Sequence, residues 1–443
     1  MMLLIGAALV VLAAAKPSDS FYPDLTRPTE PLHPSYDALP HGNRKATHND
    51  GSGAYSYCAM PHPAVSHYEL PAPVMNKSVS ASLEGVYYIQ RHQKRTAYHI
   101  YPNGEETQYD CTDMEAFQYA SAKGGRAGVP VFAQTYVAHN ELLQNFTNST
   151  CQFPQLTLGG FLDGVEHGRD LRKLYGDKLG VLPDDPKDVW LRSSNTPLTQ
   201  DSAAGVLRGL YPHQDKPVRL NVQSENVDTH GKFSCKKRDN AAAKITSEKG
   251  WLEFMNATKP IQRELVDILQ FNTSDWLSDW DHYNDNLQAR VCNGYKLPCR
   301  DGKCVSEELA RKVFAAGDWM YNYKWVVSKH APTVVRYTVG PFIAEIIAHI
   351  KKAAEGKAQR YSHLFMHDGD IAPLAASLGI KTLRWPGMAS NIALELWKAD
   401  KHYVRVLYSG STIHSTMADL EWMALDDFVS EWAKFVPKDL SEC

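Results

Sequence analysis

Residues 86–95 read Val-Tyr-Tyr-Ile-Gln-Arg-His-Gln-Lys-Arg. The β-branched and aromatic run at 86–89 is typical of a buried strand, and it ends on Arg91 and His92, with Arg95 following. In an open parallel α/β sheet, ligands bind at the carboxyl ends of the strands. Two guanidinium groups can grip a dianionic oxyanion such as phosphate while a neutral imidazole attacks its central atom. The stretch therefore predicts a phosphate site with His92 as nucleophile; the alternative is a solvated basic turn.

A second strand end has the same form. Residues 189–195 are a short apolar strand that ends at an arginine, Arg192, and a polar turn. Residues 199–210 then predict a helix, which Tyr211-Pro212 ends. A single arginine after a strand is usually a surface residue. At this strand end, however, Arg192 is expected to provide a third phosphate contact.

A third strand end supplies the remaining groups. Residues 361–370 run from a strand into His367 and Asp368, and a helix is predicted over 371–378. His367 is expected to donate a further hydrogen bond to phosphate, and Asp368 to protonate the departing alkoxide. Together the three strand ends give the predicted site: Arg91, His92, Arg95, Arg192, His367 and Asp368.

Other segments complete the predicted secondary structure. Thr157 is expected to cap a helix whose buried stripe comprises Phe161, Val165, Leu171 and Leu174. Residues 391–397 and 403–408 predict an antiparallel strand pair at the sheet edge, and the region around 420–435 is helical.

The net charge and the apolar segments limit the kinds of function expected for the protein. The chain has 443 residues and a formal net charge of −3, which argues against general nucleic-acid binding. Residues 1–15 form an apolar run ending in Ala-Ala-Ala, which predicts a cleaved secretory signal peptide. The rest of the sequence predicts no membrane span.

Cysteines and glycosylation motifs agree with secretion. Eight cysteines predict disulfide bonds, with at least one among Cys292, Cys299 and Cys304, although 105 pairings are possible. The sequence has no Cys-x-x-Cys and no histidine pair at a familiar zinc spacing, so no metal or other cofactor is expected. N-glycans are expected at five sequons: Asn76, Asn145, Asn148, Asn256 and Asn272.

The composition divides the chain into four parts. After the signal peptide, residues 16–80 form an extended arm, which Cys58 is expected to anchor and which carries no chemistry. Residues 81–215 and 331–443 form the core. Residues 216–330 are a mostly helical insertion, expected to roof the strand-end site and influence substrate choice.

These segments resemble the histidine acid phosphatases, a branch of the histidine phosphatase superfamily. The family motif Arg-His-Gly-x-Arg-x-Pro corresponds to residues 91–97, and its Arg-Ser-[Ser/Thr] segment to residues 192–194. Its His-Asp element corresponds to His367-Asp368. The resemblance extends over roughly residues 83–440 and is strongest to secretory acid-phosphatase-like members, including the phosphoxylose-type phosphatases.

The resemblance implies a fold and a set of roles. The fold would be a three-layer α/β/α sandwich with a mostly parallel central sheet and a smaller helical cap. His92 would be the nucleophile and Asp368 the proton donor. The phosphate-binding residues would be Arg91, Arg95, Arg192 and His367. The activity would be that of an acid phosphatase that uses no metal.

Two departures from the motif leave a second interpretation open. Gln93 stands where the motif has glycine, and Ala97 where it has proline. A strained or crowded Gln93 would favour a silent relative that binds phosphate esters without turnover. A mutase or transferase using the same phosphohistidine is a third interpretation. A serine hydrolase is not supported, since no Gly-x-Ser-x-Gly is present. The substrate and the oligomeric state are left open by the sequence.

Overall fold

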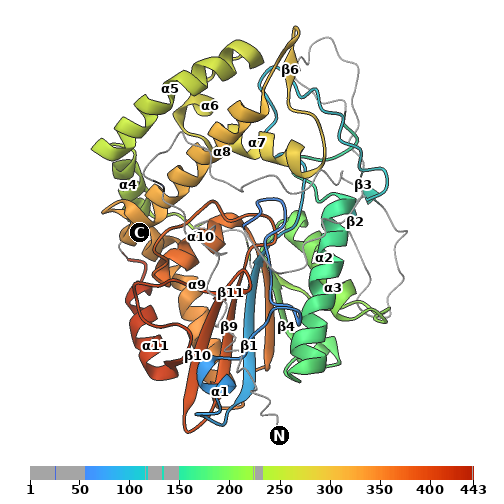
Figure 1. The fold of residues 1–443 in the computed structure, drawn as a ribbon, viewed down its shortest axis with the longest axis vertical. Coiled ribbons are helices and arrows are strands. Elements are labelled where there is room, and N and C mark those ends of the chain that lie inside the picture. Colours follow the sequence, from blue (N-terminus) through green and yellow to red (C-terminus); the bar gives the residue numbers. More distant parts are fainter. Residues whose placement is uncertain are drawn as a thin grey trace, which may run out of the picture.

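The structure is a computed structural model that describes residues 25, 55–114, 116–117, 132–133, 149–222, 224, 233–441 and 443. The predicted signal peptide, most of the predicted arm, and the sequons at Asn145 and Asn148 lie outside the described residues. A central sheet with helices on both faces occupies the lower half of the molecule in Figure 1, and further helices lie above it.

The described part of the chain contains an eight-stranded mixed sheet with the order β11-β10-β9-β1-β8-β4-β5, and β12 pairs with β10. β1, β8, β4 and β5 run parallel, whereas β9 and β10 are antiparallel to their neighbours. The antiparallel pair is confirmed. The bounds are β1 Ser82–Arg91, β4 Trp190–Ser193, β5 Asn221–Val222, β8 Tyr361–Met366, β9 Asn391–Lys398, β10 His402–Tyr408, β11 Ser411–Thr412 and β12 Met423–Ala424.

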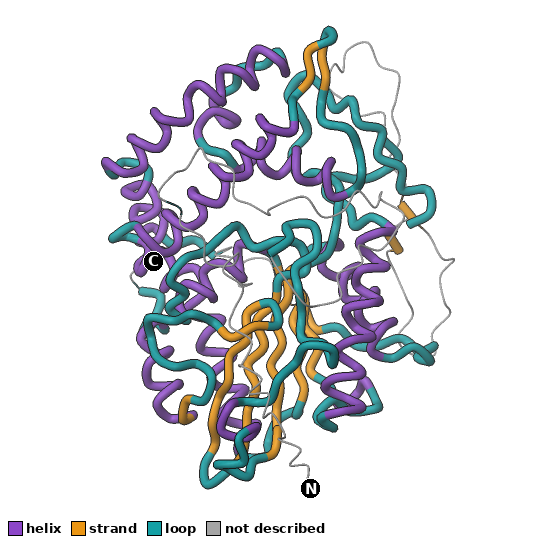
Figure 2. The backbone as a smooth tube through the Cα atoms, viewed as in Figure 1, coloured by secondary structure: helices purple, strands orange, loops and turns teal. Residues whose placement is uncertain are grey.

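β1 forms the centre of the sheet because both of its faces are apolar. Val86 and Tyr88 pack into the core beneath α2 and α3, whereas Tyr87 and Ile89 pack into the core on the opposite face. This alternation is the period of two that a strand imposes. The layers are visible in Figure 2. One face is covered by α2 Leu158–Leu171, continued by η2 Arg172–Lys178, and by α3 Pro197–Leu210. The other face is covered by α9 Ala331–Ala354, α10 Asp368–Ser377 and α11 Leu425–Trp432, the last continued by η6 Ala433–Phe435.

The α2–α3 contact differs from the predicted apolar stripe. Thr157 caps α2 as expected, accepting the N–H of Gly160 at 3.2 Å, and Leu171 and Leu174 are buried. Phe161 and Val165, however, are only half-buried. Glycines occupy the contact instead, because the two helix backbones approach too closely for larger side chains. The prediction weighed apolar size and therefore missed a face made of small residues.

Gly168 provides a test of this close approach. A Cβ added there would lie 2.0 Å from the carbonyl oxygen of Val206, which is backbone and cannot move aside cheaply. We expect Gly168→Ala to lower the free energy of unfolding by roughly 1–3 kcal/mol, the usual cost of overpacking. Urea unfolding measures it, with the exposed Glu166→Ala on the same helix as control. Equal stability of the two variants would contradict the close packing.

After β5 the chain forms the helices that lie above the sheet in Figure 1. They are α4 Lys236–Ile245, α5 Lys249–Leu269, α6 Ser274–Ser278, α7 Asp281–Cys292, α8 Glu307–Asn322 and η5 Tyr323–Val327. The short elements are α1 Ala72–Met75, η3 Pro186–Asp188 and two hairpins, β2 Ala116–Phe117 with β3 Phe132–Ala133 and β6 Cys299–Arg300 with β7 Lys303–Cys304. None of the helices in the described ranges combines the length and apolar character that crossing a bilayer requires.

All eight cysteines are paired, which confirms the disulfide prediction. The bond Cys58–Cys292 anchors the arm to the end of α7, as expected for Cys58. The bond Cys299–Cys304 closes the β6–β7 hairpin, so the expected bond within the cluster of three is also present. The others are Cys111–Cys151 and Cys235–Cys443.

A buried imidazole in β8 makes stability depend on pH. His363 hydrogen-bonds Gln90 at 2.7 Å, and burial lowers the pKa of His363 from 6.5 to about 3. Between these two pKa values His363 is protonated in the unfolded chain but neutral in the folded protein. The free energy of unfolding therefore falls as the pH drops from about 6.5 towards 3. We expect a loss of about 1.4 kcal/mol per pH unit from this group. Urea unfolding at pH 7 and pH 5 should show a shallower dependence for His363→Gln; an unchanged slope would contradict it.

Candidate active site

Three neighbouring parallel strands, β1, β8 and β4, end at the same edge of the sheet, where a cavity of about 500 Å³ opens. His92 follows β1, His367 and Asp368 follow β8, and Ser194 follows β4, and all four line this cavity. Arg95 lines it as well. The chain thus brings the predicted strand ends together, as the parallel register requires.

His92 is buried and held in a defined orientation. Its Nδ1 donates a hydrogen bond to the carbonyl of Gln93 at 2.9 Å, which leaves the lone pair of the neutral ring on Nε2. Burial, followed by the positive charges of Arg91 and Arg95, holds the pKa of His92 well below its usual value. The imidazole is therefore neutral and nucleophilic even in mildly acidic solution.

Arg91 and Arg95 lie close enough to this imidazole to influence its charge, and both are nearly inaccessible to solvent. Arg95 lines the cavity, whereas Arg91 does not. Arg91 donates to the Pro386 carbonyl and to the Tyr57 hydroxyl, and Arg95 pairs with Asp285 at 2.8 Å. The Nε groups of both arginines are buried without a hydrogen-bond partner among the described residues. Buried unpaired donors are costly, so a bound oxyanion would satisfy groups that the protein leaves open.

His367 faces His92 from the end of β8. The two ring centroids are 5.5 Å apart, with an interplanar angle of 65°. Nε2 of His367 lies 2.9 Å from the hydroxyl of Ser194, which in turn contacts Thr199 at 2.8 Å. These hydroxyls orient the His367 ring at the cavity wall.

Asp368 is the first residue of α10, and its carboxylate is surrounded by donors. Oδ2 accepts hydrogen bonds from Trp385 Nε1 at 2.5 Å and Tyr321 at 3.1 Å, and it lies 3.3 Å from Nη2 of Arg91. Burial alone would raise the pKa of Asp368, but Arg91 and the Trp385 hydrogen bond lower it well below its usual value. The carboxylate is therefore ionised in the free site, and a nearby phosphate dianion would push its pKa upward.

Arg192 is placed differently from its prediction. It does not line the cavity; its Nε lies 3.3 Å from Glu345, and its guanidinium lies over the ring of Phe342, both on α9. The physical reason is its position inside β4, where alternation directs the side chain to the α9 face. The prediction treated Arg192 as following the strand, whereas Ser194 is the residue that does. Arg91, the last residue of β1, is likewise absent from the cavity lining, so phosphate binding by either arginine stays a prediction.

Gln93 and Ala97 are accommodated without disturbing the cavity. Gln93 is not among the residues with positive φ in the described part of the chain, so its backbone does not carry the strain of a left-handed conformation. Its side chain points into the α2–α3 contact, where Ser202 donates to it at 2.5 Å. Without a proline at 97, the loop is fixed by hydrogen bonds between Thr96 and both Gln152 and Gln155.

Sequence reasoning missed four residues that hold the site. Tyr57 supports Arg91, although the arm was expected to carry no chemistry. Trp385 and Tyr321 stack at 4.2 Å and both donate to Asp368. Asp285 on α7 holds Arg95. Their only signal in the sequence analysis was Cys58, which follows Tyr57 and was expected to anchor the arm.

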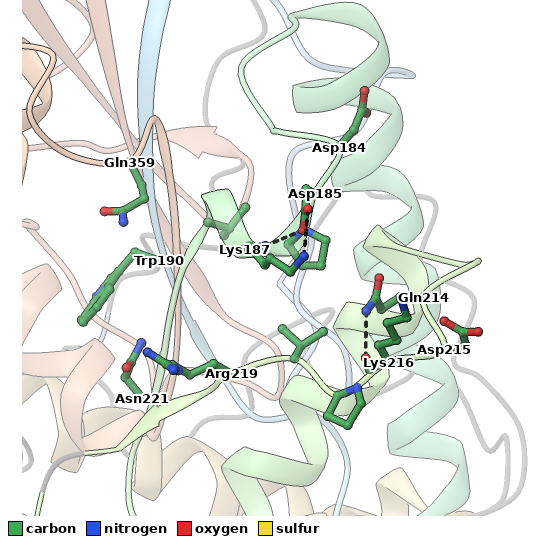
Figure 3. A pocket seen from close by; sticks show the side chains of 14 residues that line it. Asp184, Asp185, Lys187, Trp190, Gln214, Asp215, Lys216, Arg219, Asn221 and Gln359 are labelled. Atoms are coloured by element: carbon green, nitrogen blue, oxygen red, sulfur yellow. Dashed lines mark hydrogen bonds and ion pairs between the residues drawn. The ribbon is translucent and has the colours of Figure 1, made fainter. Parts of the chain in front are cut away.

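A larger cavity, of about 820 Å³, lies at the amino-terminal ends of β4 and β8 (Figure 3). Trp190 and Gln359 border it, and Lys187 lies 3.6 Å from Asp185. Its described lining includes no histidine or cysteine. The smaller cavity, in contrast, contains the predicted residues His92, Arg95, His367 and Asp368, so we consider it the candidate active site.

Comparisons with known proteins identify the family of the chain. Residues 82–409 match the histidine phosphatase superfamily (branch 2). The chain is 23% identical over 408 residues to Counting factor 60 of Dictyostelium discoideum, covering 87% of this chain and 92% of that protein. It is 24% identical over 376 residues to 2-phosphoxylose phosphatase 1 of Homo sapiens, covering 81% and 75%.

Solved structures share the fold. The phytase from Citrobacter braakii superimposes with a TM-score of 0.53 at 13% identity, over 82% of this chain and 99% of that one. The Hafnia alvei phytase gives 0.52 at 13% identity, over 81% and 97%. At such identity the likeness establishes the fold alone. The resemblance and the α/β fold predicted from the sequence are confirmed, and the chain belongs to the histidine phosphatase superfamily, branch 2, as a phosphatase.

Proposed function

We propose that this phosphatase hydrolyses small phosphate monoesters through a phosphohistidine formed on His92. The observation that carries the proposal is the environment of that residue. A neutral imidazole with its lone pair on Nε2 lies near Arg91 and Arg95, whose buried Nε donors have no hydrogen-bond partner among the described residues. Such an arrangement suits a dianionic phosphoryl group more than any neutral ligand.

The proposed reaction has two displacements at phosphorus. In the first, Nε2 of His92 forms a bond to phosphorus and the bond to the ester oxygen breaks, while Asp368 gives its proton to the leaving alkoxide. In the second, water attacks the phosphohistidine, Asp368 takes up a proton, and inorganic phosphate leaves with His92 restored. Arg91, Arg95 and His367 stabilise the charge on the non-bridging oxygens throughout.

The low pKa of Asp368 fits this cycle if the proton arrives with the substrate. The negative charge of bound phosphate offsets Arg91 and raises the pKa of the carboxyl group, so protonation is coupled to binding. This coupling favours mildly acidic solution, where monoesters carry a proton. An acid optimum is therefore part of the proposal.

We also propose that the enzyme is secreted and glycosylated. Four disulfide bonds support an oxidising compartment. Asn76, Asn256 and Asn272 are exposed, which supports glycans at these three sequons. Residues 1–15 are proposed to be the signal peptide. The helices of the 216–330 insertion, which supplies Asp285 and Tyr321, are proposed to form the cap that selects the substrate.

The first experiment is hydrolysis of p-nitrophenyl phosphate between pH 4.5 and 7.5 in the presence of a chelator. We expect turnover that survives chelation and is highest on the acid side. No turnover by a folded protein that still binds inorganic phosphate would favour the silent relative instead. A phosphorylated xylose, named for one relative, is a second substrate to test.

Gln93 distinguishes the active enzyme from the silent relative. Since its side chain contacts Ser202 and not the cavity, we expect Gln93→Ala to change kcat less than about 3-fold. The loss of a buried hydrogen bond should lower the free energy of unfolding by about 1 kcal/mol. Steady-state kinetics and urea unfolding measure the two effects. A large gain of turnover in Gln93→Gly would show that glutamine does suppress activity.

A further inference from the structure

A second cluster of ligand-type side chains lies at the rim of the catalytic cavity. His99, Asp281 and His282 each offer one ligand atom, and these atoms all lie within 4.8 Å of one another. His99 belongs to the loop after Arg95, whereas Asp281 and His282 are the first two residues of α7. We propose that this cluster, the rim site, binds one divalent cation of the zinc class.

The separations suit such an ion. Zinc binds nitrogen and oxygen ligands at about 2.0–2.2 Å, so two ligands of a tetrahedral ion lie roughly 3.3–3.6 Å apart. Nδ1 of His282 and Oδ2 of Asp281 are paired with each other at 3.3 Å, a separation that two ligands of one ion would also have. The rings of His99 and His282 are stacked, with centroids 3.6 Å apart and an interplanar angle of 21°. Small adjustments of the side chains would therefore bring two imidazoles and a carboxylate onto one ion, with water in the fourth position.

An unpartnered atom points to a missing ligand. Nδ1 of His99 is buried and has no hydrogen-bond partner among the described residues. Aromatic packing accounts for the positions of the rings, because Tyr98 contacts His99 at 4.5 Å and Trp276 contacts His282 at 5.3 Å. Packing does not satisfy the nitrogen, however, and a buried imidazole nitrogen without a partner is costly. A metal ion bound through this nitrogen would satisfy it.

The rim site is connected to Arg95, a proposed phosphate contact, but takes no part in the proposed reaction. Asp281 and Tyr98 line the cavity. One turn after Asp281, Asp285 accepts the N–H of Tyr98 at 2.6 Å and pairs with Arg95 at 2.8 Å. An ion bound to His99 and α7 would tie this loop to the helix and add positive charge beside the cavity. Its role would be to position Arg95 and not to activate water.

The test is a calorimetric titration of zinc chloride into the full-length protein, made without a histidine tag and freed of metal by a chelator. We expect one equivalent to bind, with affinity at least about 100-fold weaker in the His99→Gln, His282→Gln double variant. The matched control is His402→Gln, because His402 pairs with Glu84 at 3.0 Å but has no second imidazole. Its zinc affinity should equal that of wild type.

Thermal unfolding gives an independent readout. Zinc should raise the Tm of wild type and of His402→Gln but not that of the double variant, whose cooperative transition also demonstrates folding. Equal zinc affinity in wild type and the double variant, or no binding by wild type, would overturn the proposal. Both measurements report binding and not hydrolysis, so they remain decisive whether or not His92 proves to be the nucleophile.

Discussion

Hydrolysis of p-nitrophenyl phosphate is expected to fall by about 10⁴-fold or more in His92→Ala. The alanine removes the lone pair that forms the bond to phosphorus, and no other described histidine in the cavity can replace it. Nε2 of His367, the other candidate, is engaged with Ser194 at 2.9 Å. Inorganic phosphate should still bind to the variant, since Arg91 and Arg95 are retained.

Trapping the proposed phosphohistidine would show whether His92→Ala loses activity because the nucleophile is missing. Rapid quenching with a ³²P-labelled monoester should label wild type with an acid-labile, alkali-stable phosphoryl group, and His92→Ala should carry none. His402→Gln is the control, because His402 pairs with Glu84 and does not line the cavity; this variant should keep full activity and labelling. Labelling that persists in His92→Ala would assign the nucleophile to another residue.

Asp368→Asn is expected to have an effect that depends on the leaving group. An amide cannot give a proton to the departing oxygen, so hydrolysis of an alkyl phosphate such as β-glycerophosphate should slow by about 10²–10⁴-fold. p-Nitrophenolate needs little protonation, and its ester should lose much less. The measurement is kcat for both substrates across the pH range. The fall in kcat with rising pH, which the proposal attributes to ionisation of Asp368, should be weaker in the variant.

If Asp368→Asn acted only by disturbing the structure of the site, the loss of kcat for the two substrates would follow a different pattern. Asparagine breaks the ion pair with Arg91 at 3.3 Å but retains groups for Trp385 and Tyr321. Loss of Arg91 positioning alone would slow both substrates equally. An equal loss for the two leaving groups would therefore contradict the proton-donor role, and Trp385→Phe, which removes one hydrogen bond to the carboxylate, offers a milder comparison.

The sequence predicted those features that depend on a local pattern. The apolar run of β1 and the polar residues after β1 and β8 located His92, Arg95, His367 and Asp368 at one sheet edge. Strand periodicity and the parallel arrangement carry this information. The glycine face between α2 and α3 was missed because close helix approach selects small residues, which a search for apolar stripes passes over.

Other parts of the site could not be predicted because they depend on contacts between distant segments. Tyr57 and Asp285 reach Arg91 and Arg95 from the arm and from α7. Arg192 illustrates a different limit: the sequence does not fix the end of β4 to within one or two residues, and the structure places Arg192 inside the strand, in contact with Glu345 of α9. The metal-ligand cluster likewise joins residue 99 to α7, a separation outside any familiar zinc spacing.

The position of β1 in the middle of the sheet has a consequence for biosynthesis. The N–H of His92 donates to the carbonyl of Met366, and the N–H of Ala389 donates to the carbonyl of His92. The ribosome reaches that last partner roughly 300 residues after the histidine, which at 5–20 residues per second takes about 15–60 s. During this interval the nascent chain carries the proposed nucleophile without the residues that surround it in the folded protein. We therefore expect phosphatase activity to begin only when synthesis is nearly complete, and chains that terminate before β8 to lack it.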